Sequence, residues 1–139
     1  MKTKDLENQV RNASNFEHVA ERCKSEFIDD GCAAYLEQLM EAHGVSKKNL
    51  IIRANIERGY AYQIFRGDRA PSRDKLLQIA IGLSATLEET QKLLKLGGKS
   101  ELYSRVRRDA AILFCIEKGY SIIDTQILLS DRDLPLLKE

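Results

Sequence analysis

The sequence has no tryptophan, only two prolines and eight glycines, and no apolar run that approaches the length of a membrane span. A helix that crosses a bilayer needs about 20 apolar residues, whereas the longest run here, 110–116, is short and has charged residues at both edges. The N-terminus also lacks the apolar stretch of a signal peptide. With 43% hydrophobic residues, the composition excludes a disordered chain. We therefore expect a folded, cytoplasmic protein that makes no membrane contact.

Cysteine and histidine are scarce as well. The three cysteines, Cys23, Cys32 and Cys115, are far apart and form no C-x-x-C pair, so a disulfide framework and a zinc site are not indicated, and free thiols are expected. His18 and His43 have no companions at metal-ligand spacing, and no other cofactor motif is present. The chain also lacks a glycine-rich phosphate loop, an H-E-x-x-H motif and a recognisable nucleophile context. An enzyme is therefore not predicted.

The length of 139 residues allows one domain, or one small module with appendages. Doubly wound sheets and (β/α)₈ barrels need roughly 200 residues or more, so they are excluded. No window alternates strictly between apolar and polar residues, whereas apolar residues recur at helical spacing along most of the chain. The predicted fold class is all-α. Helices are expected over residues 15–28, 32–43, 46–54, 57–66, 73–83, 86–96, 102–118 and 121–130.

The helix boundaries follow from capping residues and glycines. Ser14, Ser46, Ser72, Thr86 and Ser121 are expected N-caps, and glycines at 44 and 119 are expected to end helices. The units 44–46 and 119–121 resemble each other, but no third unit follows at a fixed period, so a solenoid is not predicted. Gly97-Gly98 begins the clearest linker. We accordingly divide the chain into an acidic helical segment (1–31), a central domain (32–97) and a helical extension (98–139).

Positive charge is concentrated in one window of an otherwise balanced chain. The net charge is +1, yet residues 46–75 contain eight basic and three acidic side chains, while residues 1–45 contain five basic and nine acidic ones. A local basic patch of this kind suits a polyanionic partner. A solvated basic face is the simpler alternative.

Two short helices inside this window are joined by only a few residues around Asn55 and Ile56. A tight helix–turn–helix braces its second helix so that this helix can enter the major groove of DNA. The helix 57–66 meets the requirement for a polar outer face and an apolar back. Its outward residues are expected to be Arg58, Gly59, Tyr62, Gln63 and Arg66, and its inward residues Ala61, Ile64 and Phe65.

The stretch from about Tyr35 to Leu96 resembles the lambda-repressor-like, or xenobiotic-response-element-type, helix–turn–helix family of bacterial DNA-binding regulators. The resemblance is carried by residues 50–54, by Arg66-Gly67, by Pro71 and by residues 76–80. Residues 60–65 and 71–77 are also similar to a bacterial subgroup of this family that has a C-terminal helical extension. The resemblance implies a five-helix core, with one helix before it and a helical hairpin after it.

The resemblance also implies a partner, double-stranded DNA, and roles for individual residues. Arg58 and Gly59 match positions near the start of the recognition helix that meet base edges, and Gln63 matches a further one. Arginine pairs with guanine and glutamine with adenine in a bidentate geometry. Tyr62 is expected to contact DNA from the same face. Phosphate contacts, which position a protein without reading sequence, are expected from Lys47, Lys48, Arg66, Arg69 and Arg73.

The predicted function is sequence-specific DNA binding and transcriptional regulation. The alternative is an all-helical adaptor that retains the helix–turn–helix scaffold without DNA contacts. A homodimer through the C-terminal helices is also expected, using Val106, Leu113 and Phe114 together with the apolar tail 134–137. Packing of these side chains back onto the core is the competing interpretation. Arg105, Arg107 and Arg108 are expected to form a solvated face that pairs with Asp109 and nearby acids.

Overall fold

The computed structural model describes residues 2–22 and 31–138, and all of its regular structure in these ranges is helical. This confirms the all-α class. No helix in the described ranges is long and apolar enough to cross a membrane. The helices are α1 (Thr3–Asn12), α2 (Phe16–Arg22), α3 (Cys32–His43), α4 (Lys47–Ala54), α5 (Arg58–Phe65), α6 (Arg73–Leu83), α7 (Leu87–Leu96), α8 (Arg107–Lys118) and α9 (Ile122–Asp131).

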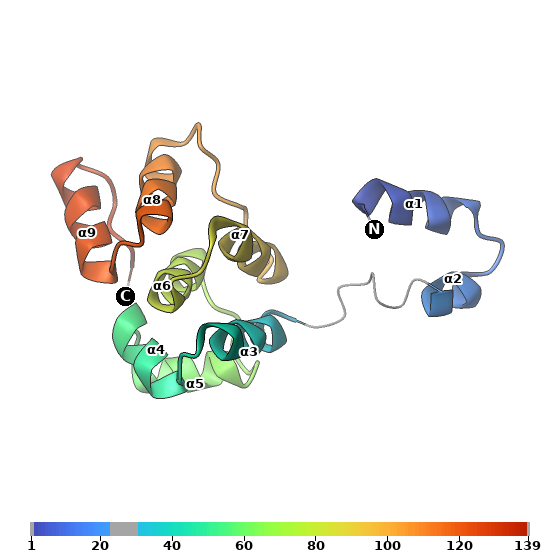
Figure 1. Ribbon diagram of the computed structural model, residues 1–139, viewed down its shortest axis with the longest axis horizontal. Coiled ribbons are helices and arrows are strands. Elements are labelled where there is room, and N and C mark those ends of the chain that lie inside the picture. Colours follow the sequence, from blue (N-terminus) through green and yellow to red (C-terminus); the bar gives the residue numbers. More distant parts are fainter. Residues whose placement is uncertain (1, 23–30, 139) are drawn as a thin grey trace.

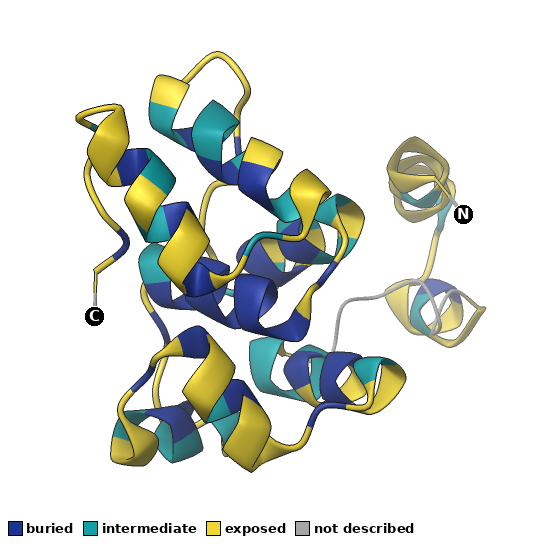
Figure 2. Cartoon of the chain, turned by 60° about the vertical axis from the view of Figure 1, so that its left-hand side comes forward, coloured by how far each residue is buried: buried dark blue, intermediate teal, exposed yellow. Residues whose placement is uncertain are grey.

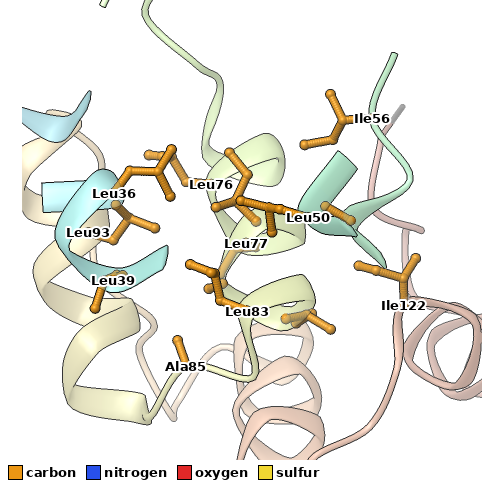
Figure 3. Close-up of a cluster of buried hydrophobic side chains, with 14 of the residues drawn as sticks. Leu36, Leu39, Leu50, Ile56, Leu76, Leu77, Leu83, Ala85, Leu93 and Ile122 are labelled. Carbon is orange, nitrogen blue, oxygen red and sulfur yellow. The ribbon is translucent and has the colours of Figure 1, made fainter. Parts of the chain in front are cut away.

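Helices α3 to α9 pack together, whereas α1 and α2 lie beside each other and apart from the rest (Figures 1 and 2). The centre of the packed part is α6, in which every residue from 75 to 83 is buried. One core cluster joins α3 to α9, and Figure 3 shows Leu36, Leu76 and Leu93 meeting where α3 covers α6 and α7. The core therefore runs without interruption from the predicted central domain into the predicted extension.

Several helix junctions share one local design, which explains the short connections. A left-handed residue ends the first helix, the next residue donates its amide back to that helix, and the third residue caps the following helix. Left-handed backbone closes a helix by satisfying its last carbonyls. This design occurs at Gly44-Val45-Ser46, Asn55-Ile56-Glu57, Ser84-Ala85-Thr86 and Gly119-Tyr120-Ser121.

The hairpin α6–α7 and the hairpin α8–α9 are two versions of one unit, offset by 35 residues. Both have Arg-Asp in the first turn of their first helix, and both place Thr-Gln in the second helix followed shortly by Leu-Leu. In both, the threonine hydroxyl donates to the carbonyl of the N-cap residue at 2.8 Å. The similar junctions at 44–46 and 119–121 are visible in the sequence and do not indicate a solenoid, but this two-copy repeat of a hairpin was not predicted from them. The matching residues are 73/108, 74/109, 81/116, 90/125, 91/126, 93/128, 94/129 and 102/137.

The two Arg-Asp pairs join the hairpins reciprocally. Arg73 binds Asp109 through two hydrogen bonds of 3.0 and 2.9 Å, and Arg108 binds Asp74 through two of 3.1 and 3.0 Å. Burial by itself raises the pKa of each aspartate, but the hydrogen bonds and charge of the facing arginine bring the pKa below its ordinary value. Such an exchange of partners is what a local twofold relation between the hairpins produces.

Further bonds repeat in both halves and fasten the segment that follows each hairpin. Gln91 donates to the carbonyl of Leu102 and accepts from its amide, at 2.9 and 2.7 Å, and Gln126 does the same with Leu137, at 2.9 and 2.8 Å. The segment after Gly97-Gly98 is therefore tied to the core. The arginines add bonds to carbonyls, Arg73 to Ser100 and Glu101, and Arg108 to Pro135 and Leu136.

Most predicted helices are confirmed in position, and the differences lie at the N-terminus and in α8. Helix α1 was not predicted, because its apolar residues are few and none of its residues is buried. The predicted helix 15–28 is present as α2, and its remaining part, 23–28, lies outside the described residues. Asn15, rather than Ser14, accepts the amide of His18 at the start of α2.

The start and the inward face of α8 were predicted wrongly. The helix begins at Arg107 rather than near residue 102, and its buried residues are Asp109, Ile112 and Cys115. Val106 and Phe114, expected either at a dimer contact or packed back onto the core, are exposed, so they do not pack onto the core. Residues 110–116 are apolar on every side, so local periodicity does not select a face. In the observed orientation of α8, Asp109 faces inward and forms an ion pair with Arg73 on α6.

Candidate nucleic-acid interface

Helices α4 and α5 form a tight helix–turn–helix at one edge of the packed part of the chain (lower left in Figure 1). Three residues separate them, and the first, Asn55, has a left-handed backbone with φ of 55°. The second, Ile56, is buried and donates its amide to the carbonyl of Ile51 at 3.2 Å. A turn of three or four residues is typical of DNA-binding helix–turn–helix units.

The first turn of α5 is organised by the Glu57 carboxylate. Its oxygens accept hydrogen bonds from the amides of Gly59 and Tyr60 at 2.8 and 2.7 Å, and these bonds lower the pKa of Glu57. A Cβ atom at Gly59 would lie only 3.2 and 3.3 Å from the carboxylate oxygens. The glycine therefore leaves room for the capping side chain, at the usual cost of about 1 kcal/mol for glycine in a helix.

The inner and outer faces of α5 are largely those expected from the sequence. Ala61 and Ile64 are both buried at 2% exposure, and Phe65 is partly buried against the core. Arg58 is exposed, and its guanidinium lies 5.6 Å from the centre of the Tyr62 ring. Tyr62 is itself partly buried, with its ring edge-on to Phe65. Arg58 and Tyr62 thus form a contiguous pair on the outward face.

Gln63 and the loop after α5 form a small network of exposed polar contacts. The Gln63 side-chain oxygen accepts a hydrogen bond from Arg69 at 3.3 Å, and the Arg69 guanidinium lies 4.4 Å from the centre of the Tyr60 ring. Arg66 pairs with Asp68 at 3.0 Å. Exposed ion pairs are worth about 0–1 kcal/mol, so a phosphate can compete for these cations. Sequence reasoning missed the stacking of Arg69 on Tyr60.

Lys47 and Lys48 lie in the first turn of α4, whose N-cap Ser46 accepts the amide of Asn49 at 3.2 Å. Both lysines are exposed. Among the described residues, no carboxylate lies within ion-pair distance of either lysine or of Arg58. The beginnings of α4 and α5 therefore present cations that are not neutralised locally.

Arg73 does not fit the phosphate-contacting role expected from the sequence. Its guanidinium is three-quarters buried, binds both carboxylate oxygens of Asp109 and donates to two backbone carbonyls. Arg108, expected on a solvated face, is likewise used within the fold, in its pair with Asp74. The signal that could have revealed both roles is the repeated Arg-Asp at a spacing of 35 residues.

Other candidate chemical groups are tied to structural partners. His43 lies 2.9 Å from Glu89. Burial raises the pKa of Glu89, but hydrogen bonds from Thr86 and His43 lower it to below its ordinary value. Cys32 and Cys115 are free thiols whose pKa is raised by burial, and Cys23 lies outside the described residues. In the part of the chain that the structure describes, no three metal-binding side chains gather.

No family model, curated protein or solved structure matches this chain.

Proposed function

We propose that this protein is a sequence-specific DNA-binding transcriptional regulator, with α3 to α7 as a lambda-repressor-like core and α5 as its recognition helix. The observation that carries the proposal is the α4–α5 unit. A three-residue turn sets α5 at the edge of the fold with Arg58 exposed in its first turn, and the exposed Lys47 and Lys48 begin the preceding helix with no carboxylate within ion-pair distance among the described residues. A major groove about 12 Å wide admits one such helix.

Base reading is assigned to the outward residues of α5. Arg58 can form two hydrogen bonds with guanine, and Gln63 can pair with adenine once DNA displaces its weak contact with Arg69. Tyr62 supports the Arg58 guanidinium and offers its ring to a thymine methyl group. Gly59, which lacks a side chain, lets the helix backbone approach the bases closely.

Phosphate contacts are assigned to four residues that flank this helix. Lys47 and Lys48 begin α4, whereas Arg66 and Arg69 follow α5. Contacts of this kind position the protein and make its affinity depend on salt. Arg73 is left out because its guanidinium is bound within the fold.

The adaptor interpretation requires an apolar surface at the same place, since protein interfaces have apolar centres depleted of charge. Between residues 46 and 66, Ile52 on α4 is the large apolar side chain that is exposed, at 68%. Its apolar sequence neighbours Leu50, Ile51 and Ile56 are buried or packed against the core, so they do not extend the exposed apolar surface. These features favour DNA over a protein partner.

Selection of bound fragments from random duplex DNA tests the proposal directly. We expect enrichment of one site, and Arg58→Ala should lower affinity for that site by roughly 10- to 100-fold with little effect on unselected DNA. Arg105→Ala removes an exposed arginine outside the α4–α5 unit and serves as the matched control. No enrichment would contradict the proposed function, and equal losses on all sequences would contradict the role of Arg58.

A further inference from the structure

The first hairpin has a closely filled apolar region beneath α3. Leu76 on α6 and Leu93 on α7 are both fully buried, and Leu36 of α3 meets them there (Figure 3). Leu76 also fills the space beside Gly97 at the end of α7, because a Cβ atom at this glycine would lie only 2.5 Å from the Leu76 Cδ1 atom. Three leucines, one from each helix, therefore close this part of the core.

The second hairpin differs from the first at the equivalent positions. Ala111 stands where α6 has its leucine, so the side chain that fills the first hairpin is absent here. Arg132 stands where the first hairpin has its glycine, so a long cationic side chain follows the end of α9. Leu128, the counterpart of the fully buried Leu93, is only partly buried. The equivalent pairs are 76/111, 93/128 and 97/132.

A pocket of about 440 Å³ lies at this place on the second hairpin. Binding sites for small molecules have volumes of about 300–1,000 Å³ and combine a mainly apolar lining with a few polar groups. The lining here has that character, because it consists of four apolar side chains and two arginines. These residues are Ala111, Phe114, Leu128, Leu134, Arg107 and Arg132.

The two arginines make the pocket positively charged. Both are exposed, and among the described residues no carboxylate lies within ion-pair distance of either one. The charged side chains that line the pocket are these two alone, so no acid opposes them there. An anionic group on a ligand would therefore meet two cations that the fold does not use.

The neighbouring groove limits how much negative charge the ligand can have. This groove shares Leu128 and Arg132 with the pocket, and Asp124 and Asp131 also line it. A polyanion that extended from the pocket into the groove would meet these carboxylates and be repelled. A ligand with one carboxylate and an apolar body fits the pocket without that cost.

We propose that the pocket between α8 and α9 binds a small amphipathic carboxylate. The apolar body of the ligand lies on Ala111, Phe114 and Leu128, in the space that leucine side chains fill on the first hairpin. Its carboxylate pairs with Arg107 and Arg132, whose planar guanidinium groups match carboxylate geometry. Phe114, which is 43% exposed, is covered when the ligand is bound.

Titration of the full chain with sodium octanoate, followed through amide chemical shifts by NMR, tests the pocket. We expect saturable shifts at the amides of the pocket residues and a dissociation constant of roughly 1 mM or less. Octan-1-ol has the same apolar body without the charge and should bind about 10-fold more weakly. Octylammonium, which has the opposite charge, should give no saturable shifts at these amides.

Two variants separate the apolar from the charged part of the site. Ala111→Leu restores the residue of the first hairpin and should abolish octanoate binding, because the added side chain fills the pocket. The double variant Arg107→Gln/Arg132→Gln should weaken octanoate binding about 10-fold and leave octan-1-ol binding unchanged, since only the carboxylate meets the arginines. Arg105→Gln changes an exposed arginine outside the pocket lining and is the matched control, which should bind octanoate like the wild type.

The inference would be overturned by a wild type that shows no saturable shifts up to about 10 mM octanoate. Unchanged octanoate affinity in the double arginine variant would overturn it as well. A wild type that self-associates through this hairpin and binds no octanoate would assign the pocket to a second copy instead. If Ala111→Leu does not fold, the arginine variant decides, because it changes only exposed side chains. No DNA is present in these experiments, so each result leaves the proposed DNA binding untouched.

Discussion

The two hairpins share their internal bonds but differ in what packs around them. The α6–α7 hairpin is enclosed by α3 and α4, whereas the α8–α9 hairpin leaves several large apolar side chains exposed. Part of this difference in packing is explained by Gly82 in α6 and Glu117 at the equivalent position in α8. A Cβ at Gly82 of α6 would lie 3.0 Å from the Ala54 nitrogen, while α8 has Glu117 at the same place.

Some residues form the hairpin itself, whereas others determine which helices pack against it. The Arg-Asp and Thr-Gln pairs, the caps and the left-handed junctions are common to both hairpins and produce the same local structure. Gly82 lets α4 approach α6, where Gln78 also donates to the Ala54 carbonyl at 3.1 Å. Leu113 and Glu117 replace Gln78 and Gly82 in α8, so no helix can dock there in the same way.

The largest effect on stability is expected from exchanging the residues at positions 82 and 117, which determine whether another helix can pack closely. Gly82→Glu places a charged side chain against α4 in a buried, close-packed position, and we expect a loss of about 4 kcal/mol or more in the free energy of unfolding, measured with urea. The reverse change, Glu117→Gly, removes only an exposed side chain and should cost about 1 kcal/mol from helix propensity. Similar costs for both changes would show that the two faces do not differ as described.

The reciprocal ion pairs provide a test of the equivalence itself. Asp109→Asn and Asp74→Asn each remove one charge from a largely buried pair and leave an arginine without its partner, so each should destabilise by about 3 kcal/mol. The two losses should agree within about 1 kcal/mol, because the pairs are equivalent by the local twofold relation. If one of the two variants kept nearly the wild-type free energy of unfolding, the two ion pairs would not be equivalent.

The same carboxylates predict a dependence of stability on pH. The pKa values of Asp74 and Asp109 are lowered in the folded chain, so the unfolded chain binds protons first as the pH falls. Their contribution is complete above the unfolded pKa of about 3.9 and is lost as the pH falls through the lower folded values. Urea unfolding between about pH 7 and 3 should show this loss, and the double variant Asp74→Asn/Asp109→Asn should lack that part of it.

The glutamine bonds should give the smallest effects. Gln91→Ala and Gln126→Ala each remove two hydrogen bonds to one leucine backbone, and each should cost about 1–2 kcal/mol. Hydrogen exchange at the amides of Leu102 and Leu137 would show which segment is released in each variant. Release of both segments by either variant would mean that the two halves are not fastened independently.

Much of the fold was predictable because its signals are local. Caps at Ser46, Ser72, Thr86 and Ser121, and left-handed glycines at 44 and 119, act within one turn of a helix and were found from the sequence. The inward face of α8 was not found, because that face is determined by contacts with α7 and α9 and by the pair of Asp109 with Arg73, which local periodicity does not show. The 35-residue repeat was not predicted, because its identical residues are few and are scattered among positions at which the two hairpins differ.

The local features of the candidate site were likewise predictable from the sequence, whereas the features that depend on distant contacts were not. The turn, the Glu57 cap and the buried face of α5 follow from residues within one segment. The role of Arg73 depends on Asp109 and on carbonyls far along the chain, so sequence reasoning counted it among the free cations. Basic residues in one window are thus not equally available to a ligand.

The salt dependence of binding to duplex DNA tests the central claim most directly. With the selected site, Lys47→Ala should reduce the slope of log affinity against log salt by about one unit for each bound chain, while Lys99→Ala, an exposed lysine beyond α7, should leave the slope unchanged. Equal slopes for the wild type and Lys47→Ala, or no binding to duplex DNA at about 50 mM salt, would contradict the account.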